Sequence, residues 1–158
     1  MWLGNLTRIT GLSLHNNSFM GQIPSSLSNL RDLTYVSLRY DNFEGMDPYF
    51  LTNLTKLTSI DLSFNQLTGQ FDKFQFSKSL NILALDNNKL YGSIPKSISN
   101  LMNLTYLDIS SNDLTGIVDL DTFKNLKKLV TINFHANLLH GKASYSTIFC
   151  AILFYLNQ

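Results

Sequence analysis

The sequence predicts an α/β solenoid, a right-handed superhelix of about six coils with a parallel β-sheet on its concave face and short helical or 3-10 turns on its convex face. Three observations predict this fold. The stretches LSLHNNSFMGQIP (12–24) and LALDNNKLYGSIP (83–95) spell nearly the same phrase. The frame L-x-L-x-x-N recurs in coils that start near residues 6, 30, 54, 77, 101 and 126, at intervals of 23 to 25 residues. A glycine follows the Asn or Asp of each frame by four residues.

The first part of each coil is expected to form a short strand. Two apolar residues alternate with outward residues, which is the period of a strand with one buried face. Stacked coils would pair these strands into a parallel sheet over a shared aliphatic core. The expected buried pairs are Leu12/Leu14, Val36/Leu38, Ile60/Leu62, Leu83/Leu85, Leu107/Ile109 and Ile132/Phe134.

An asparagine follows the strand in five coils, and Asp41 takes its place in the second. An inward amide can satisfy backbone groups of the turn, and we expect it also to bond to its equivalent in the next coil. A carboxylate accepts hydrogen bonds but does not donate them. The rung at Asp41 is therefore expected to be the weakest of this ladder.

The second half of each coil carries turn signals. The repeated glycines are expected where the backbone needs a positive φ or a close approach. Pro24 and Pro95 complete an Ile-Pro pair whose fixed φ suits the edge of a coil. The segments SSLSNL (25–30), KSISNL (96–101) and DTFKNL (121–126) are expected to close their coils as short helical turns.

Two regions are expected, a solenoid over 1–142 and an apolar non-repeat tail over 143–158. The apolar run IFCAILFYL (148–156) is too short for the roughly 20 residues of a membrane-spanning helix, and the first residues lack the pattern of a secretory signal. Three interpretations of the tail stay open. It could be non-native sequence produced by a truncated or misread gene, an apolar plug that covers the last coil, or a weak anchor at a membrane surface.

Composition argues against several function classes. A net charge of +1 with scattered Lys and Arg gives no field for nucleic acid, and the single cysteine, Cys150, allows neither an internal disulfide nor a CxxC metal site. His15 and His135 would lie five coils apart, about 24 Å, too far to share a metal or act as a dyad. An open sheet also gives no enclosed pocket for a general acid. We therefore expect no enzyme, no metal and no cofactor.

The outward residues of the strands predict a binding surface on the concave face. Because neighbouring strands lie about 4.8 Å apart, residues in equivalent positions form files across the coils. Aromatic residues and Arg are frequent interface anchors, and a nearby acidic group suits a basic or amine-bearing partner. The alternative is an ordinary solvated sheet face, where Tyr reflects strand preference. The candidate ligand-binding residues are Tyr35, Arg39, Tyr40, Asp61, Phe64, Asp86, Tyr106 and Asp108.

Four Asn-x-Ser/Thr sequons would be glycan acceptors in a secreted protein. We expect modification at Asn5, Asn53 and Asn103. A glycan on Asn16 would obstruct the concave sheet, so this sequon is expected to stay free.

The motif NxLxGxIP in NNKLYGSIP (87–95), together with SISNLMNLTYLDISSNDLTGIVDLDTFKNLKKL (97–129), resembles the plant-type leucine-rich repeat. The resemblance covers about residues 3–142. Over this range the chain is similar to a fragment of the ectodomain of plant receptor-like proteins. It implies a curved solenoid with a second, smaller sheet. It also implies recognition of a peptide or protein ligand and of a co-receptor kinase, in defence or developmental signalling at the extracellular side of the plasma membrane.

The chain departs from that family in lacking cysteine-paired caps, a signal peptide, a transmembrane helix and an acidic juxtamembrane segment. Two alternatives to the receptor interpretation therefore stay open. One is a soluble cell-wall repeat protein similar to the polygalacturonase inhibitors. The other is a truncated fragment without independent activity.

Overall fold

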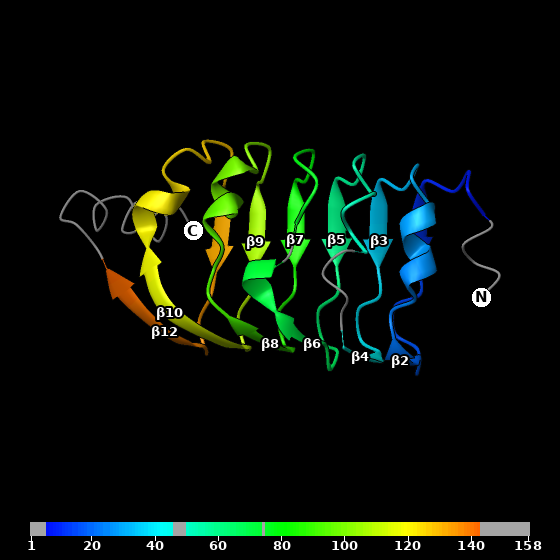
Figure 1. Cartoon of the computed structure of the whole chain (residues 1–158), viewed down its shortest axis with the longest axis horizontal. Coiled ribbons are helices and arrows are strands. Elements are labelled where there is room, and N and C mark those ends of the chain that lie inside the picture. The colour runs from blue at the N-terminus through cyan, green and yellow to red at the C-terminus, as the bar shows by residue number, and fades with distance from the viewer. Residues whose placement is uncertain (1–5, 46–49, 74, 143–158) are drawn as a thin grey trace.

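The computed structural model describes residues 6–45, 50–73 and 75–142. Six three-residue strands stand side by side in one parallel sheet, one from each expected coil (Figure 1). The sheet runs in sequence order β1-β3-β5-β7-β9-β11, with no strand out of turn. The strands are β1 (Gly11–Ser13), β3 (Tyr35–Ser37), β5 (Ser59–Asp61), β7 (Ile82–Ala84), β9 (Tyr106–Asp108) and β11 (Thr131–Asn133).

The register of this sheet aligns equivalent residues of successive coils. Each central apolar residue pairs with its equivalent in the next coil, so that one row forms across the whole sheet. The row is Leu12, Val36, Ile60, Leu83, Leu107 and Ile132. Outward neighbours such as Tyr35 and Ser59 pair in the same way, which confirms the predicted files.

A second set of parallel strands follows the Asn or Asp of each coil. Four of these strands form a sheet with the order β12-β10-β8-β6, and β2 and β4 form a separate two-stranded sheet. A single parallel bridge between Glu44 of β4 and Gln66, shortly before β6, lies between the two sheets. These strands pair with a stagger, since Met20 lies opposite Asn42 and Lys89 opposite Thr68. The strands are β2 (Met20–Gln22), β4 (Asn42–Glu44), β6 (Thr68–Gln70), β8 (Lys89–Gly92), β10 (Asp113–Asp119) and β12 (Leu138–Lys142).

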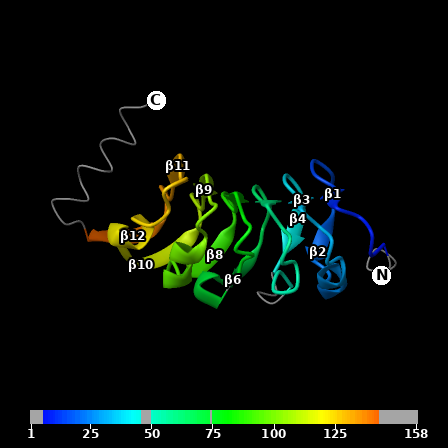
Figure 2. The ribbon, with the colours of Figure 1, turned by 90° about the horizontal axis from the view of Figure 1, so that it is seen from above.

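Short 3-10 turns close the coils, as the sequence predicts. They are η2 (Ser25–Asn29), η3 (Phe71–Lys73), η4 (Lys96–Asn100) and η5 (Leu120–Phe123). Pro24 and Pro95 precede η2 and η4 with φ of −65° and −71°, the values that the proline ring imposes. Seen from above, β1, β3, β9 and β11 lie along one side of the coils and β2, β6, β8, β10 and β12 along the other (Figure 2). The buried apolar residues of all coils form one continuous core cluster.

Burial of the core is complete in the middle and weaker at both ends. Leu62, Leu83 and Leu85 are fully buried. The equivalent Leu14 in the first coil and Phe134 in the last are only partly buried. This follows from stacking, because a terminal coil has a neighbour on one side only.

The asparagine that follows the strand in five coils forms hydrogen bonds with backbone groups, and not with the equivalent asparagine of the next coil as expected. The Nδ2 of Asn88 donates to the carbonyl oxygens of Leu85 and Asp86 in its own coil and of Leu62 in the preceding coil. Its Oδ1 accepts from the backbone N–H of Leu67. The expected bond to the equivalent asparagine was wrong, since coils about 4.8 Å apart hold equivalent side chains beyond hydrogen-bond distance while the backbone lies closer.

Asp41 is buried, and it accepts hydrogen bonds as an asparagine would but cannot donate them. Its Oδ1 accepts from the backbone N–H groups of Asn17 and Phe19, both at 3.1 Å. Its Oδ2 is enclosed without a hydrogen-bond partner. The prediction that this rung accepts without donating is confirmed, and its weakness relative to the other rungs stays a prediction.

Candidate functional site

The concave sheet brings the predicted aromatic residues of coils two and three together. The rings of Tyr40 and Phe64 stack with centroids 4.2 Å apart and planes inclined by 21°. The guanidinium carbon of Arg39 lies 4.7 Å from the centroid of Tyr40 and 5.4 Å from that of Phe64. We call these three residues the aromatic cluster. Tyr35, one strand residue away from the core row, is 40% exposed beside it.

The backbone of the aromatic cluster is unusual. Tyr40 and Phe64 have φ of 55° and 53°, in the left-handed region that bulky residues rarely adopt. The equivalent residue has a positive φ in every coil: Asn16, Tyr40, Phe64, Asn87, Ser111 and Ala136. Asn fits this conformation best among residues with a side chain, so aromatic rings at two of these positions cost stability that Asn or Gly would not. The repeat frame did not predict this conformation, although Asn16 and Asn87 at the same position were a signal of it.

Arg39 retains donors for a ligand. Its Nη1 lies 3.9 Å from Oδ2 of Asp61, and its Nη2 donates to the Tyr40 hydroxyl at 3.5 Å, both long contacts. Its side chain remains 43% exposed. The terminal nitrogens are thus held in place without being saturated.

Two of the predicted acidic residues are engaged within the chain. Oδ1 of Asp61 accepts from the backbone N–H and the hydroxyl of Ser63, and Oδ1 of Asp108 accepts from the same two groups of Ser110. Oδ2 of Asp108 accepts from the Tyr106 hydroxyl and from Nδ2 of Asn133. Asp108 is only 8% exposed, so its carboxylate is largely occupied within the chain.

Tyr106 is also part of the hydrogen-bond network around Asp108. Burial, together with the charge and the hydrogen bond of Asp108, raises the pKa of Tyr106 to about 12. Ser37 and Ala84, in the same file as Asp108, are buried too, which corrects the expectation that this file faces solvent.

Asp86 is the predicted acidic residue with the most free capacity. It is half-buried, and among the described residues only Asn87 donates a side-chain hydrogen bond to it, from Nδ2 to Oδ2 at 2.9 Å. Burial raises the pKa of Asp86 above the ordinary 3.8, and the charges of Asp108 and Asp61 raise it further, against the hydrogen bond from Asn87 that lowers it. A partner cation would relieve this unfavourable charge.

A shallow hollow of about 580 Å³ opens beside the aromatic cluster, between the first and second coils. We call it the Tyr40 hollow. Its lining combines ring faces with polar groups and one residue of the third coil. The lining residues are His15, Asn16, Tyr35, Ser37, Arg39, Tyr40 and Asp61.

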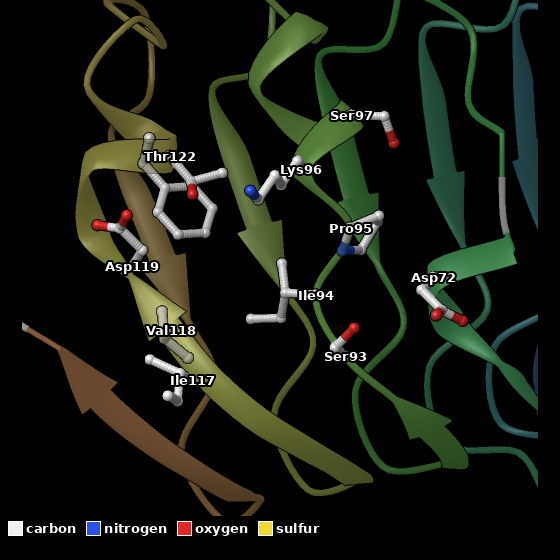
Figure 3. Close-up of a pocket in the computed structure, with 11 residues that line it drawn as sticks. Asp72, Ser93, Ile94, Pro95, Lys96, Ser97, Ile117, Val118, Asp119 and Thr122 are labelled. Atoms are coloured by element: carbon white, nitrogen blue, oxygen red, sulfur yellow. The ribbon is translucent and has the colours of Figure 1, made fainter.

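The convex side carries a second hollow, of about 460 Å³, that the repeat frame does not predict (Figure 3). Ile94, Ile117 and Val118 line it between β8 and β10, and Asp72 and Asp119 lie at its two ends. The signal was Ile117, an apolar residue at an outward position of the repeat that is 69% exposed. This hollow belongs to the convex side and adds nothing to the concave surface.

The two concave histidines lie far apart, as expected. His15 follows β1 and its Nδ1 contacts Oγ of Ser13 at 2.7 Å, whereas His135 follows β11 and its Nδ1 contacts Oδ1 of Asn133 at 2.6 Å. Within residues 6–45, 50–73 and 75–142, no three His, Cys, Asp or Glu side chains are grouped so that they could hold a metal ion. Cys150 and the rest of the tail lie outside these ranges.

The sequons differ in their surroundings. Asn53 is exposed in the turn before β5. Asn103 is partly buried, its Nδ2 donating to the Lys78 carbonyl at 3.4 Å and its Oδ1 accepting from Lys128 Nζ at 2.8 Å. Asn5 lies outside the described residues, and Asn16 lines the Tyr40 hollow as expected from its file. None of the helices in the part of the chain that the structure describes is both long enough and apolar enough to cross a bilayer.

Sequence comparison identifies one repeat family over most of the solenoid. Family models described as leucine rich repeat match residues 31–90 and 55–114, and also 8–30 and 103–126. Together these matches span all coils but the last. No match was found among curated proteins.

Solved structures of plant proteins share the fold. The ectodomain of the Arabidopsis receptor kinase HAESA, in complex with an extended IDA peptide hormone, is 37% identical with a TM-score of 0.83 over 89% of this chain and 24% of its own. The plant peptide hormone receptor RGFR1, in complex with RGF2, is 32% identical with a TM-score of 0.65 over 87% and 26%. A chain of the BIR3–SERK2 complex from Arabidopsis thaliana is 33% identical with a TM-score of 0.66 over 78% and 65%. The present chain thus spans less than two thirds of each of these solved chains.

Proposed function

The chain belongs to the leucine-rich repeat family, and from this premise we propose that it is the ligand-binding segment of a plant cell-surface receptor-like protein. Its concave face would bind a peptide or protein, and the segment itself would perform no catalysis. The fold supports this role because stacked coils fix the core and leave the outward files free to vary.

The observation that carries the proposal is the aromatic cluster. Tyr40 and Phe64 occupy left-handed positions where an asparagine would be less strained, and Tyr40 is 45% exposed although it stacks on its neighbour. Strain and exposed rings at one place favour a recognition role over a purely structural one. Arg39 adds exposed donors at the same place.

The charge of the surface supports a partner with a basic or amine group. Asp86 is half-buried and underbonded, whereas Asp61 and Asp108 already accept several hydrogen bonds. A cation placed over Asp86 would therefore gain a charge-assisted hydrogen bond without breaking a bond within the chain. In this proposal Asp61, Tyr106 and Asp108 hold the surface in place through hydrogen bonds within the chain and do not contact the ligand directly.

The similar solved structures support two kinds of partner. HAESA and RGFR1 were solved with peptide hormones, and BIR3 was solved with SERK2. We extend both kinds to this chain, a peptide ligand on the concave face and a co-receptor kinase as a second protein. The full-length protein would act in defence or developmental signalling at the extracellular side of the plasma membrane, with glycans at Asn5, Asn53 and Asn103.

Selection from a random peptide library tests the proposal. The full chain is immobilised and panned in parallel with two variants. One replaces Arg39, Tyr40 and Phe64 by Ala, Asn and Asn. The other replaces the exposed convex residues Ile117 and Lys96 by Ser and Gln. We expect peptides that bind the wild type and the convex variant but not the concave variant. Equal recovery on all three proteins, or no recovery on the folded wild type, would contradict a concave ligand face.

A further inference from the structure

We infer that the Tyr40 hollow receives an aromatic side chain of the bound peptide, which adds one ring to the Tyr40–Phe64 stack. The inference rests on the proposed function and deepens it, because it names the chemical group that the hollow selects. It depends on which face of Tyr40 is open.

Arg39 does not cover that face. Its guanidinium carbon lies 4.7 Å from one ring centroid and 5.4 Å from the other, while the two centroids are themselves 4.2 Å apart. A group above the outer face of Tyr40 would be several ångströms farther from Phe64 than from Tyr40. The nearly equal distances therefore place the guanidinium beside the edges of both rings. The contact between Nη2 and the Tyr40 hydroxyl agrees with this position.

The outer face of Tyr40 points toward the first coil, because Phe64 of the third coil covers the other face. The equivalent position in the first coil is Asn16, which has a small side chain and the same left-handed backbone, with φ of 58°. The stack thus ends at Tyr40, and the Tyr40 hollow begins there. Aromatic rings pair with centroids 4.5–7 Å apart, close to the spacing of one coil, so a further ring fits the next rung.

The lining favours an uncharged ring over a cation or an aliphatic group. Asp61 also lines the hollow, but its Oδ1 already accepts two hydrogen bonds from Ser63 and its Oδ2 lies 3.9 Å from Nη1 of Arg39. The positive charge of Arg39 therefore offsets that carboxylate and opposes a second cation in the same hollow. The donors and acceptors of Asn16 and His15 suit the polar edge of a Tyr or Trp, and Tyr35 offers a second ring surface. An aliphatic side chain would leave these polar groups without a partner.

The position of Asp86 then predicts a spacing in the ligand. The hollow lies between the first and second coils and Asp86 lies in the fourth, which corresponds to about 12 Å at the usual strand spacing. An extended peptide rises about 3.3 Å per residue and alternates its faces, so the fourth residue along lies about 13 Å away on the same face. We therefore expect a Lys or Arg four residues from the aromatic side chain.

The test is the sequence of the peptides that the library selection recovers. Peptides that depend on the concave face are expected to carry Trp, Tyr or Phe four residues from Lys or Arg. A synthetic peptide with this pattern should bind Tyr40→Asn about 3- to 10-fold more weakly than the wild type. Tyr91→Asn is the matched control, since Tyr91 is an exposed tyrosine on β8 of the other sheet. It should bind the peptide like the wild type.

The outcomes separate the two proposals. Recovered peptides that need the concave face but lack an aromatic side chain would overturn the inference and leave the proposed function standing. The same holds if Tyr40→Asn binds the aromatic peptide as tightly as the wild type. Failure to recover any concave-dependent peptide would overturn both. Circular dichroism of each variant shows that it is folded, and Tyr40→Asn is expected to be folded because Asn suits the left-handed backbone.

Discussion

At the scale of single residues, the repeat consists of side chains that satisfy the backbone of the preceding coil. Asn65, Asn88 and Asn112 each donate from Nδ2 to backbone carbonyls and accept at Oδ1 from a backbone N–H one coil earlier. The amide is suited to this place because it donates and accepts at once. Asp41 shows what is lost when only the acceptor is present.

Asp41→Asn is expected to raise the free energy of unfolding by about 1–2 kcal/mol, because the new Nδ2 replaces an enclosed oxygen that has no partner. Chemical denaturation of the two proteins measures the difference. The reverse change, Asn88→Asp, should destabilise by a similar or larger amount because Asn88 makes several buried bonds. A destabilised Asp41→Asn variant would show that the carboxylate has a partner that the geometry does not reveal.

Asp86 predicts a pH dependence of stability. Its pKa is raised in the folded chain, so between the ordinary aspartate value of 3.8 and its native pKa the folded state binds more protons than the unfolded state. This group therefore lowers stability as the pH rises through that window, and it has no effect below it. In thermal melts from about pH 3 to about pH 7, the melting temperature of Asp86→Asn should rise relative to that of the wild type as the pH rises. The difference should become constant once the pH exceeds the native pKa of Asp86. A constant difference between the two melting temperatures would contradict the assignment.

At the scale of elements, each strand depends on having a neighbour on both sides. Leu83 of β7 is fully buried between two coils, whereas Leu14, just beyond β1, is partly buried at the end of the stack. The same substitution at these two places should therefore have different costs. Leu83→Ala is expected to cost about 2–5 kcal/mol and Leu14→Ala clearly less, as measured by urea denaturation. Equal costs would show that the first coil is covered as well as the central ones.

The turn after β8 depends on a missing side chain. Gly92 has φ of 89°, and a Cβ there would lie 3.1 Å from Cγ of Gln70 and 3.4 Å from Oδ1 of Asp72. Gly92→Ala should destabilise the chain by about 1–2 kcal/mol in denaturation experiments, because both the conformation and the space disfavour a side chain. Gly141→Ala is the matched control, since a Cβ on Gly141 would meet no atom within 4 Å and its φ lies outside the left-handed region. A Gly92→Ala variant as stable as its control would contradict the packing described around η3.

At the scale of the whole molecule, the fold was predictable from the sequence because one short frame recurs and each recurrence must bury the same face. The core row from Leu12 to Ile132 and the 3-10 turns at 25–29 and 96–100 follow directly from that frame. The stacking of Tyr40 on Phe64 was predictable only as a grouping of aromatic residues. Its backbone conformation was not, because it depends on the turn that every coil makes after its strand.

The acidic residues show where sequence reasoning reaches its limit. Asp61 and Asp108 lie between the two core residues of their coils, and each accepts hydrogen bonds from a serine two residues later. Asp86 follows the second core residue of its coil and has Asn88 at that distance, so the sequence separates it from the other two but does not show how deeply each carboxylate is buried. The difference depends on which file each residue occupies and on what covers that file. Such cover is a property of the packed coils and not of any single frame.

Hydroxyl-radical footprinting of the full chain, with and without a peptide recovered by selection, tests the concave ligand face most directly. Tyr40, in the bend after β3 at the concave face, and Tyr91, on β8 of the four-stranded sheet, have similar exposed fractions of 45% and 52%, so each serves as the reference for the other. Bound peptide should slow the oxidation of Tyr40 several-fold and leave that of Tyr91 unchanged. Protection of Tyr91 with Tyr40 unprotected would place the ligand on the other sheet and contradict binding at the concave face.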